Sequence, residues 1–167
     1  MTSWAIAKKI ERLGLFHLSS YDKGFLEATL DTDGMVGLHL DKRQFKPRVD
    51  VTNTNLSFLL RVKAICRGFG VIYQNNGGCT SDLIDREKCL ALYRYCMPAT
   101  LQRVILPQLK LTIKEPQRRL LIEALRLIKQ RRGRGSWKKE YIRNRLKEIH
   151  DEIVKLNSRS RRTPNCS

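Results

Sequence analysis

The sequence lacks the cysteine spacing that is typical of metal sites. Its five cysteines are an odd number and include no Cys-x-x-Cys pair, which argues against a zinc site or a disulfide framework and for a reducing compartment. It also lacks a long apolar run, and residues 1–12 are too polar for an export signal. We therefore expect an intracellular protein of the cytoplasm, nucleoid or an organelle matrix that is neither secreted nor embedded in a membrane.

Acidic residues are scarce in this chain. Its 167 residues include 33 Lys and Arg against 16 Asp and Glu, which gives a formal net charge of +17. Such an excess goes well beyond what solubility requires and indicates a polyanionic partner. A basic protein of the membrane surface is the competing interpretation, which the lack of an apolar segment disfavours. The length predicts one domain with a real hydrophobic core.

The pattern of apolar residues changes its period within residues 25–41. Up to Thr32, small residues recur at every fourth position, which predicts one face of a helix. These small residues are Gly24, Ala28 and Thr32. After Gly34, apolar residues alternate with others, which predicts a half-buried strand. Asp31 and Asp33 stand at the change of period, just before a glycine that suits a tight turn.

Small residues on one helical face allow a second helix to approach closely, so that carboxylates at the two helix ends would meet. Two such carboxylates repel unless a divalent cation lies between them, and Mg²⁺ prefers carboxylate oxygens and substrate phosphates. The spacing equally allows Asp31 and Asp33 simply to cap a helix end and a turn. A calcium loop is disfavoured, because Met35 and Lys42 stand where it needs oxygen ligands.

Residues 26–34, Leu-Glu-Ala-Thr-Leu-Asp-Thr-Asp-Gly, resemble the LAGLIDADG motif of homing endonucleases. The match comprises the first leucine, a small residue, the apolar Leu30 and the closing Asp-x-Asp-Gly. The similarity extends over roughly residues 20–157. Further points of similarity are Val-Thr-Asn-Thr-Asn at 51–55, Gly-x-Ile at 70–72, the segment with Pro107, Leu109, Lys114 and Gln117, and Leu-Asn at 156–157.

The resemblance implies an α+β fold. A mixed or antiparallel β-sheet would form a DNA-binding saddle, with helices packed on its opposite face in an αββαββα core followed by C-terminal helices. One domain is expected over residues 1–157, with an N-terminal helix at 3–13, a core at 20–115 and the C-terminal helices at 116–157. The basic tail at 158–167 is predicted to be disordered.

The local patterns also predict the individual elements. The expected strands are 35–41, 44–53, and a hairpin of 71–75 with 79–84 across Asn-Asn-Gly-Gly. The expected helices are 55–67, 86–96 with Asp85 as its N-cap, 99–106, 116–130 and 137–157, with a connector at 109–113 and a basic loop at 131–136.

Polar residues on the strand at 44–53 form a candidate DNA-reading face. Alternation alone favours an ordinary solvated face. A two-stranded ribbon, however, fits the DNA major groove, where Arg reads guanine, Gln reads adenine and Asp accepts from cytosine, and the resemblance favours this reading. The candidate residues are His39, Asp41, Arg43, Gln44, Lys46, Arg48, Asp50, Tyr73 and Asn75.

The resemblance further implies a homing endonuclease that makes a double-strand cut in a long pseudo-palindromic site by Mg²⁺-dependent hydrolysis, with Mn²⁺ as a substitute. Asp33 would bind the metal, with the Thr32 carbonyl as a further ligand. Lys114 would stabilise charge on the phosphate, and Asn53 would order water. Asp31 is expected to hydrogen-bond rather than to bind metal.

A single motif per chain implies a homodimer, whose twofold axis would run between the two small-residue faces. The interface residues would be Gly24, Ala28 and Thr32. Two positions depart from the family pattern, since Glu27 replaces a small residue and Thr29 a bulky apolar one. Glu27 lies off the small face, so we expect it to be exposed or paired.

Two alternative functions stay open. One is a group I intron RNA maturase, for which the same fold and basic surface would bind intron RNA. The other is a non-catalytic nucleic-acid-binding protein. The presence of both Asp33 and Lys114 favours the endonuclease that acts in intron homing.

Overall fold

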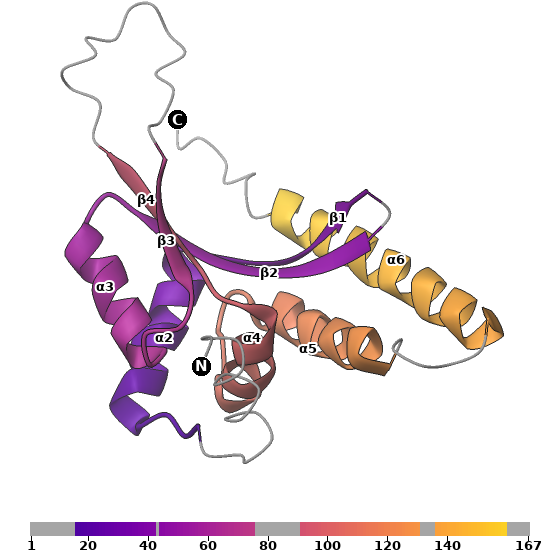
Figure 1. Cartoon of the computed structure of the whole chain (residues 1–167), viewed down its shortest axis with the longest axis horizontal. Coiled ribbons are helices and arrows are strands. Elements are labelled where there is room, and N and C mark those ends of the chain that lie inside the picture. The colour runs from indigo at the N-terminus through magenta and orange to yellow at the C-terminus, as the bar shows by residue number, and fades with distance from the viewer. Residues whose placement is uncertain (1–15, 43, 76–90, 131–135, 160–167) are drawn as a thin grey trace, which may run out of the picture.

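The structure, a computed structural model, describes residues 16–42, 44–75, 91–130 and 136–159 (Figure 1). Several predicted features therefore lie outside the described residues. They are the helix at 3–13, Arg43, the strand at 79–84 with its turn, the cap Asp85, most of the loop at 131–136, and nearly all of the tail at 158–167. No described helix is long and apolar enough to cross a membrane.

Four strands form one antiparallel sheet in the order β1-β2-β4-β3. The strands are β1 Gly34–Asp41, β2 Gln44–Asn53, β3 Val71–Asn75 and β4 Leu92–Cys96. The helices are α2 Ser20–Thr32, α3 Leu56–Ile65, α4 Ala99–Ile105 with the 3-10 turn Leu106–Gln108, α5 Glu115–Gln130 and α6 Ser136–Arg159. In Figure 1 the helices α2, α4 and α5 lie on one side of the curved sheet, and α6 runs beside β1. The α+β fold is confirmed.

The helix-to-strand switch occurs where the change of period predicts it. The Ser19 hydroxyl caps α2 by accepting the N–H of Asp22 at 3.1 Å, and Leu26 and Leu30 are buried. A Cβ added to Gly34 would lie 2.6 Å from the Leu30 backbone, so only glycine allows so tight a change from helix to strand.

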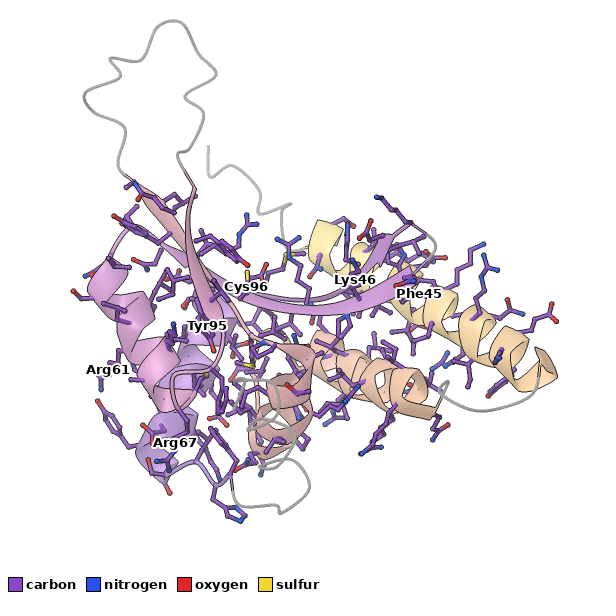
Figure 2. All side chains as sticks on the ribbon, viewed as in Figure 1. Phe45, Lys46, Arg61, Arg67, Tyr95 and Cys96 are labelled. Atoms are coloured by element: carbon purple, nitrogen blue, oxygen red, sulfur yellow. The ribbon has the colours of Figure 1, made fainter. Side chains whose placement is uncertain are left out.

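One prediction of secondary structure is wrong. Of the helix expected at 86–96, residues 92–96 instead form β4, between β2 and β3. Tyr95 is fully buried, and its hydroxyl donates to the Phe69 carbonyl oxygen at 2.7 Å (Figure 2). Pairing on both edges of β4 and burial of this aromatic ring outweigh a local apolar pattern that fits a helix equally well.

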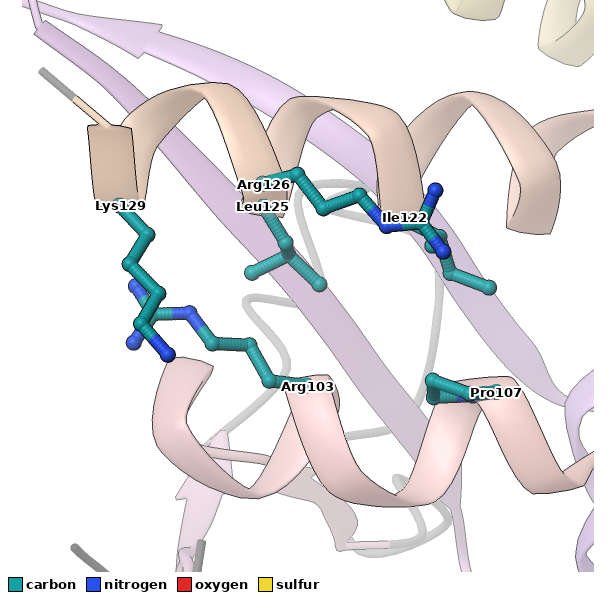
Figure 3. Close-up of a pocket in the computed structure, with 6 residues that line it drawn as sticks. All are labelled: Arg103, Pro107, Ile122, Leu125, Arg126 and Lys129. Carbon is teal, nitrogen blue, oxygen red and sulfur yellow. The ribbon is translucent and has the colours of Figure 1, made fainter. Parts of the chain in front are cut away.

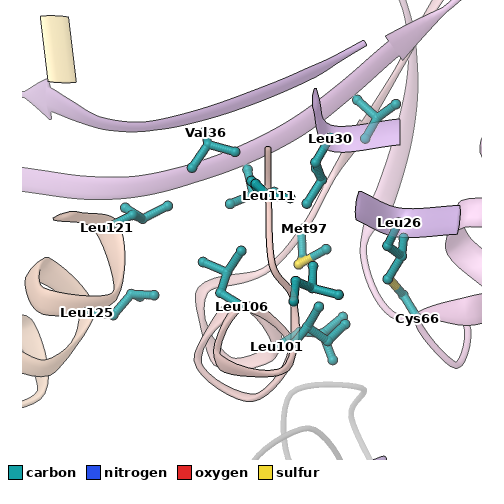
Figure 4. Packing of buried hydrophobic residues seen from close by; sticks show 14 of the residues in the cluster. Leu26, Leu30, Val36, Cys66, Met97, Leu101, Leu106, Leu111, Leu121 and Leu125 are labelled. Atoms are coloured by element: carbon teal, nitrogen blue, oxygen red, sulfur yellow. The ribbon is translucent and has the colours of Figure 1, made fainter. Parts of the chain in front are cut away.

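The core lies between the sheet and the helices (Figure 4). Val36 of β1 and Val49 and Val51 of β2 face it, and Leu106 and Leu121 cover them from the helical layer. The alternate residues of each strand therefore project from the opposite face of the sheet. We call this second surface the polar face.

Candidate active site and nucleic-acid interface

Asp33 caps the C-terminus of α2 and is exposed. Its N–H donates to the Thr29 carbonyl at 3.0 Å, and its own carbonyl accepts the N–H of Thr52 at 3.3 Å. On the side chain, Oδ2 accepts a hydrogen bond from Asn53 Nδ2 at 2.7 Å. The structure thus brings together the candidate metal-binding carboxylate and the candidate water-ordering amide.

Lys114 reaches the same place from a segment about 80 positions later in the sequence. Its ammonium group lies against the turn between α2 and β1 and donates to three backbone carbonyls. The acceptors are Gly34 at 2.6 Å, Leu30 at 2.8 Å and Thr32 at 3.4 Å. Burial lowers the pKa of Lys114, while the nearby charges of Asp31 and Asp33 oppose that shift. The cation therefore lies beside the Thr32 carbonyl and near Asp33.

The connector at 110–114 is held by carboxylates, which accept all five of its backbone N–H groups. Lys110 donates to Glu27 (2.6 Å), Leu111 to Glu115 (3.1 Å), and Thr112 (2.7 Å), Ile113 (3.1 Å) and Lys114 (2.9 Å) to Asp31. Asp31 is thus a hydrogen-bonding residue, as predicted, and Glu27 is paired, as expected. Because Asp31 holds the backbone of Lys114 itself, it fixes where that side chain begins.

The ligands at the α2 end suit a hard divalent cation. The Asp33 carboxylate is exposed, and a backbone carbonyl, that of Thr32, lies next to it in the chain. Among the residues that the structure describes, no three His, Cys, Asp or Glu side chains come together as a metal site. The described part of one chain thus offers a single carboxylate and a carbonyl here, which fit part of a magnesium site.

The small-residue face of α2 is open. Gly24, Ala28 and Thr32 are exposed, and a Cβ added to Gly24 would meet nothing within 4 Å. The Thr32 hydroxyl turns back to the Ala28 carbonyl at 2.9 Å, which keeps its polar group off this face. A second helix could therefore pack here at short range.

The strand register places the predicted DNA-reading residues on the polar face. His39 lies opposite Lys46, and Asp41 opposite Gln44, and directly opposed residues share a face. His39, Gln44 and Lys46 are exposed, and Lys46 Nζ contacts Asp41 at 2.5 Å (Figure 2). These four residues are therefore together at one end of the sheet.

Other predicted readers occupy the remainder of the polar face. Arg48 binds Asp50, which is buried at 4 % exposure and so does not stand open to a base. Tyr73 is 53 % exposed on β3. Asn75 pairs with Leu92 in the ladder, but its side chain, like all of Arg43, lies outside what the structure describes.

No protein-family model matches the sequence, and no curated protein matches it. Solved structures do match. The homing endonuclease I-CvuI, in complex with the I-CreI target in the presence of 2 mM Mg with the DNA not cleaved, has a TM-score of 0.60 at 18% identity, over 83% of this chain and 85% of that one. The archaeal intron-encoded homing endonuclease I-Vdi141I, complexed with DNA, has a TM-score of 0.62 at 15% identity, over 81% and 84%. The chain has the fold of a homing endonuclease.

This homing-endonuclease fold also shows a residue that sequence reasoning missed. Arg94 of β4 lies opposite Thr52 of β2 and Tyr73 of β3, so it shares the polar face. The helix predicted for this segment concealed it. The signal that could have found it is the alternation of Tyr93, Arg94 and Tyr95, which is typical of a strand.

Two basic pockets lie away from the polar face. One, of about 190 Å³, has an apolar floor that includes Pro107 and Ile122 and cations from α4 and α5 (Figure 3). Its cations are Arg103, Arg126 and Lys129. The other, of about 400 Å³, lies between the β1–β2 hairpin and α6, where the rings of Phe45 and His150 are 6.1 Å apart.

Proposed function

We propose that this protein is a sequence-specific homing endonuclease that cuts both strands of a long, pseudo-palindromic DNA site by divalent-metal-dependent hydrolysis. The observation that carries the proposal is the meeting of Asp33, Asn53 and Lys114, which are far apart in sequence, at the open end of α2. The DNA in both structural neighbours, and the Mg in one, supports it.

Each of these side chains has a distinct role in the proposed reaction. Mg²⁺ would supply an activated water and stabilise the leaving oxygen. Asp33 would hold the ion together with the Thr32 carbonyl, and Asn53 keeps the Asp33 carboxylate in one orientation. Lys114 offers positive charge to the phosphate that is cut.

The proposed active form is a homodimer. One chain supplies one Asp33, and the exposed face formed by Gly24, Ala28 and Thr32 ends next to it. Packing two copies of α2 along this face would bring the two Asp33 carboxylates to the twofold axis, where divalent ions would relieve their repulsion. The two polar faces would then read the two halves of the site.

A maturase that binds intron RNA remains the second candidate. The observation that favours it is the pocket between α4 and α5 that is lined by Arg103, Arg126 and Lys129 (Figure 3). Cations placed there would bind a phosphate backbone outside the sheet.

We also propose a reducing compartment, since Cys66 and Cys96, the cysteines within the described residues, are free thiols.

The test is plasmid cleavage in Mg²⁺ against a library of DNA sites, with wild type compared with Asp33→Asn. We expect wild type to cut one site on both strands, and the variant to bind that site without cutting it. Glu152→Gln, which neutralises an exposed carboxylate of α6, is the control and should cut normally. Tight binding of structured RNA with no cleavage of any site would instead support the maturase.

A further inference from the structure

Arg48 and Asp50 form an ion pair along β2. They stand two residues apart on the polar face, and Arg48 Nε donates to Asp50 Oδ2. The Asp50 side chain is only 5% exposed, whereas that of Arg48 is 32% exposed. The carboxylate of the pair is therefore buried, and the guanidinium reaches the surface.

The two residues that face Asp50 across the sheet are not cations. Asp50 lies opposite Met35 of β1 and opposite Cys96 of β4. Burial and the adjacent Asp50 raise the pKa of the Cys96 thiol to about 11, so Cys96 stays neutral. A buried carboxylate without a cation is costly, so Asp50 and Arg48 hold each other in place.

This pairing leaves the two terminal nitrogens of Arg48 available to contact a DNA base. A guanidinium has five N–H donors, and the bond to Asp50 uses the one on Nε. Within the described residues, neither terminal nitrogen has a hydrogen-bond partner. These two nitrogens form the fork that binds guanine O6 and N7 in the major groove. Opposite Arg48 in β1 stands Gly37, so β1 adds no side chain at that register.

We infer that Asp50 is a positioning residue that holds Arg48 as a guanine reader, and that the pair specifies one G·C base pair in each half of the DNA site. Asp50 does not itself read cytosine. The inference rests on the proposed function and deepens it, because it assigns a base to one position of the unknown target. The restraint on Arg48 reduces the side-chain entropy lost on binding. It also holds the fork in one orientation, which favours guanine because guanine accepts both of its hydrogen bonds.

A second ion pair on the same face serves as a matched control. Lys46 binds Asp41, but these side chains are 58% and 38% exposed. An ammonium on a flexible chain acts as a point charge without the planar fork of arginine. Neutralising Asp41 thus removes the same charge from the same face without touching Arg48.

The experiment is selection of bound sites from a randomised DNA library by wild type, Asp50→Asn, Arg48→Lys and Asp41→Asn. Wild type should prefer guanine at one position per half-site by about 5- to 150-fold, the range for a bidentate contact. Arg48→Lys should lose that preference. Asp50→Asn should reduce it several-fold at that same position alone, even as the loss of negative charge raises affinity for all sequences. Asp41→Asn should leave the guanine preference at that one position unchanged, even where it alters the preference at the position that Asp41 itself faces.

Two outcomes would overturn the inference. In one, Asp50→Asn keeps the full guanine preference; in the other, it loses a cytosine preference at a different position, which would make Asp50 a direct reader. If Asp50→Asn does not fold, Asp50→Glu keeps the charge but shifts the carboxylate, and it too should weaken the preference at that position. Failure of wild type to select any DNA site would instead refute the proposed endonuclease itself.

Discussion

Asn53 donates a hydrogen bond from Nδ2 to the Asp33 carboxylate at 2.7 Å, across 20 positions of the sequence. Asp33 ends a helix, and Asn53 ends the second strand after it. Hydrogen bonds from neighbouring side chains orient the carboxylates that bind metals and tune their affinity. The bond predicts for Asn53 a role that is separate from contact with DNA.

Asn53→Ala should therefore slow cleavage about 10- to 100-fold while DNA affinity changes little. Single-turnover cleavage and equilibrium binding of the same duplex provide the two measurements. Asn144→Ala, which truncates an exposed amide of α6, should leave both unchanged. An equal loss of binding and cleavage would instead make Asn53 a DNA-contacting residue.

The pH dependence of cleavage should report on Lys114. Burial lowers its pKa, so its positive charge is lost at a lower pH than that of a surface lysine. The cleavage rate should fall as pH rises through this value. In Asp31→Asn, a negative charge that opposes the lowering of the Lys114 pKa is gone. The decline of the cleavage rate should therefore occur at a lower pH than in wild type.

Glu27→Gln is the control for this pH shift. Glu27 also holds the connector, through Lys110, but its charge does not contribute to the pKa shift of Lys114. The variant should leave unchanged the pH at which the cleavage rate declines, even where it slows the reaction. If that pH moved equally in both variants, the change would come from loosening of the connector rather than from the loss of charge.

Ala28→Leu should break the proposed dimer. A larger side chain in a close helix contact costs about 1–3 kcal/mol, so the dimer dissociation constant should rise about 5- to 150-fold. Analytical ultracentrifugation measures this constant, and cleavage should fall with the dimer population. Lys155→Leu, at an exposed site on α6, should have no such effect. A wild type that stays monomeric on its DNA would contradict the arrangement.

Glu115 should make stability depend on acid pH. Its bonds to Arg118 and Arg119 lower its pKa from 4.5 to about 2. The stabilisation is complete above pH 4.5 and is lost as pH falls towards 2, because protonation ends the pairing. Glu115→Gln should thus lower the Tm at neutral pH, and the difference from wild type should shrink across that window.

Gly70→Ala should be more damaging than Gly68→Ala. Both glycines have positive φ, +94° and +78°, so alanine costs roughly 1–2 kcal/mol at either site. Of the two sites, only at Gly70 would the new Cβ meet neighbours: the Tyr95 ring at 2.5 Å and the Cys96 carbonyl oxygen at 2.7 Å. Chemical denaturation should show a further loss of about 1–3 kcal/mol for Gly70→Ala. Equal losses would mean that both the ring and the Cys96 carbonyl can move aside.

Local pattern was enough to predict the part of the fold that carries Asp33. The small-residue repeat and the alternation that follows it define α2 and β1, because burial imposes a period of 3.6 on a helix and 2 on a strand. The same alternation placed Lys46 and Arg48 on the polar face. These elements are long and regular enough for one pattern to dominate.

Reasoning from local sequence patterns failed where the structure depends on long-range pairing. Residues 92–96 form a strand because β2 and β3 lie on either side of them, and a local pattern does not contain that information. Asp50 follows the correct alternation, yet it is buried beneath Arg48. The anchoring of Lys114 by Asp31, across 83 positions, likewise depends on tertiary contacts.

The carboxylate-held connector has a consequence for protein synthesis. Asp33 and Asn53 leave the ribosome long before the segment that carries Lys114, and the connector docks only when Glu27 and Asp31 meet it. A nascent chain that ends before residue 110 can begin to pair its strands but lacks the cation of the site. The proposed active site would thus be complete only after the segment through Lys114 has been made and has docked against α2.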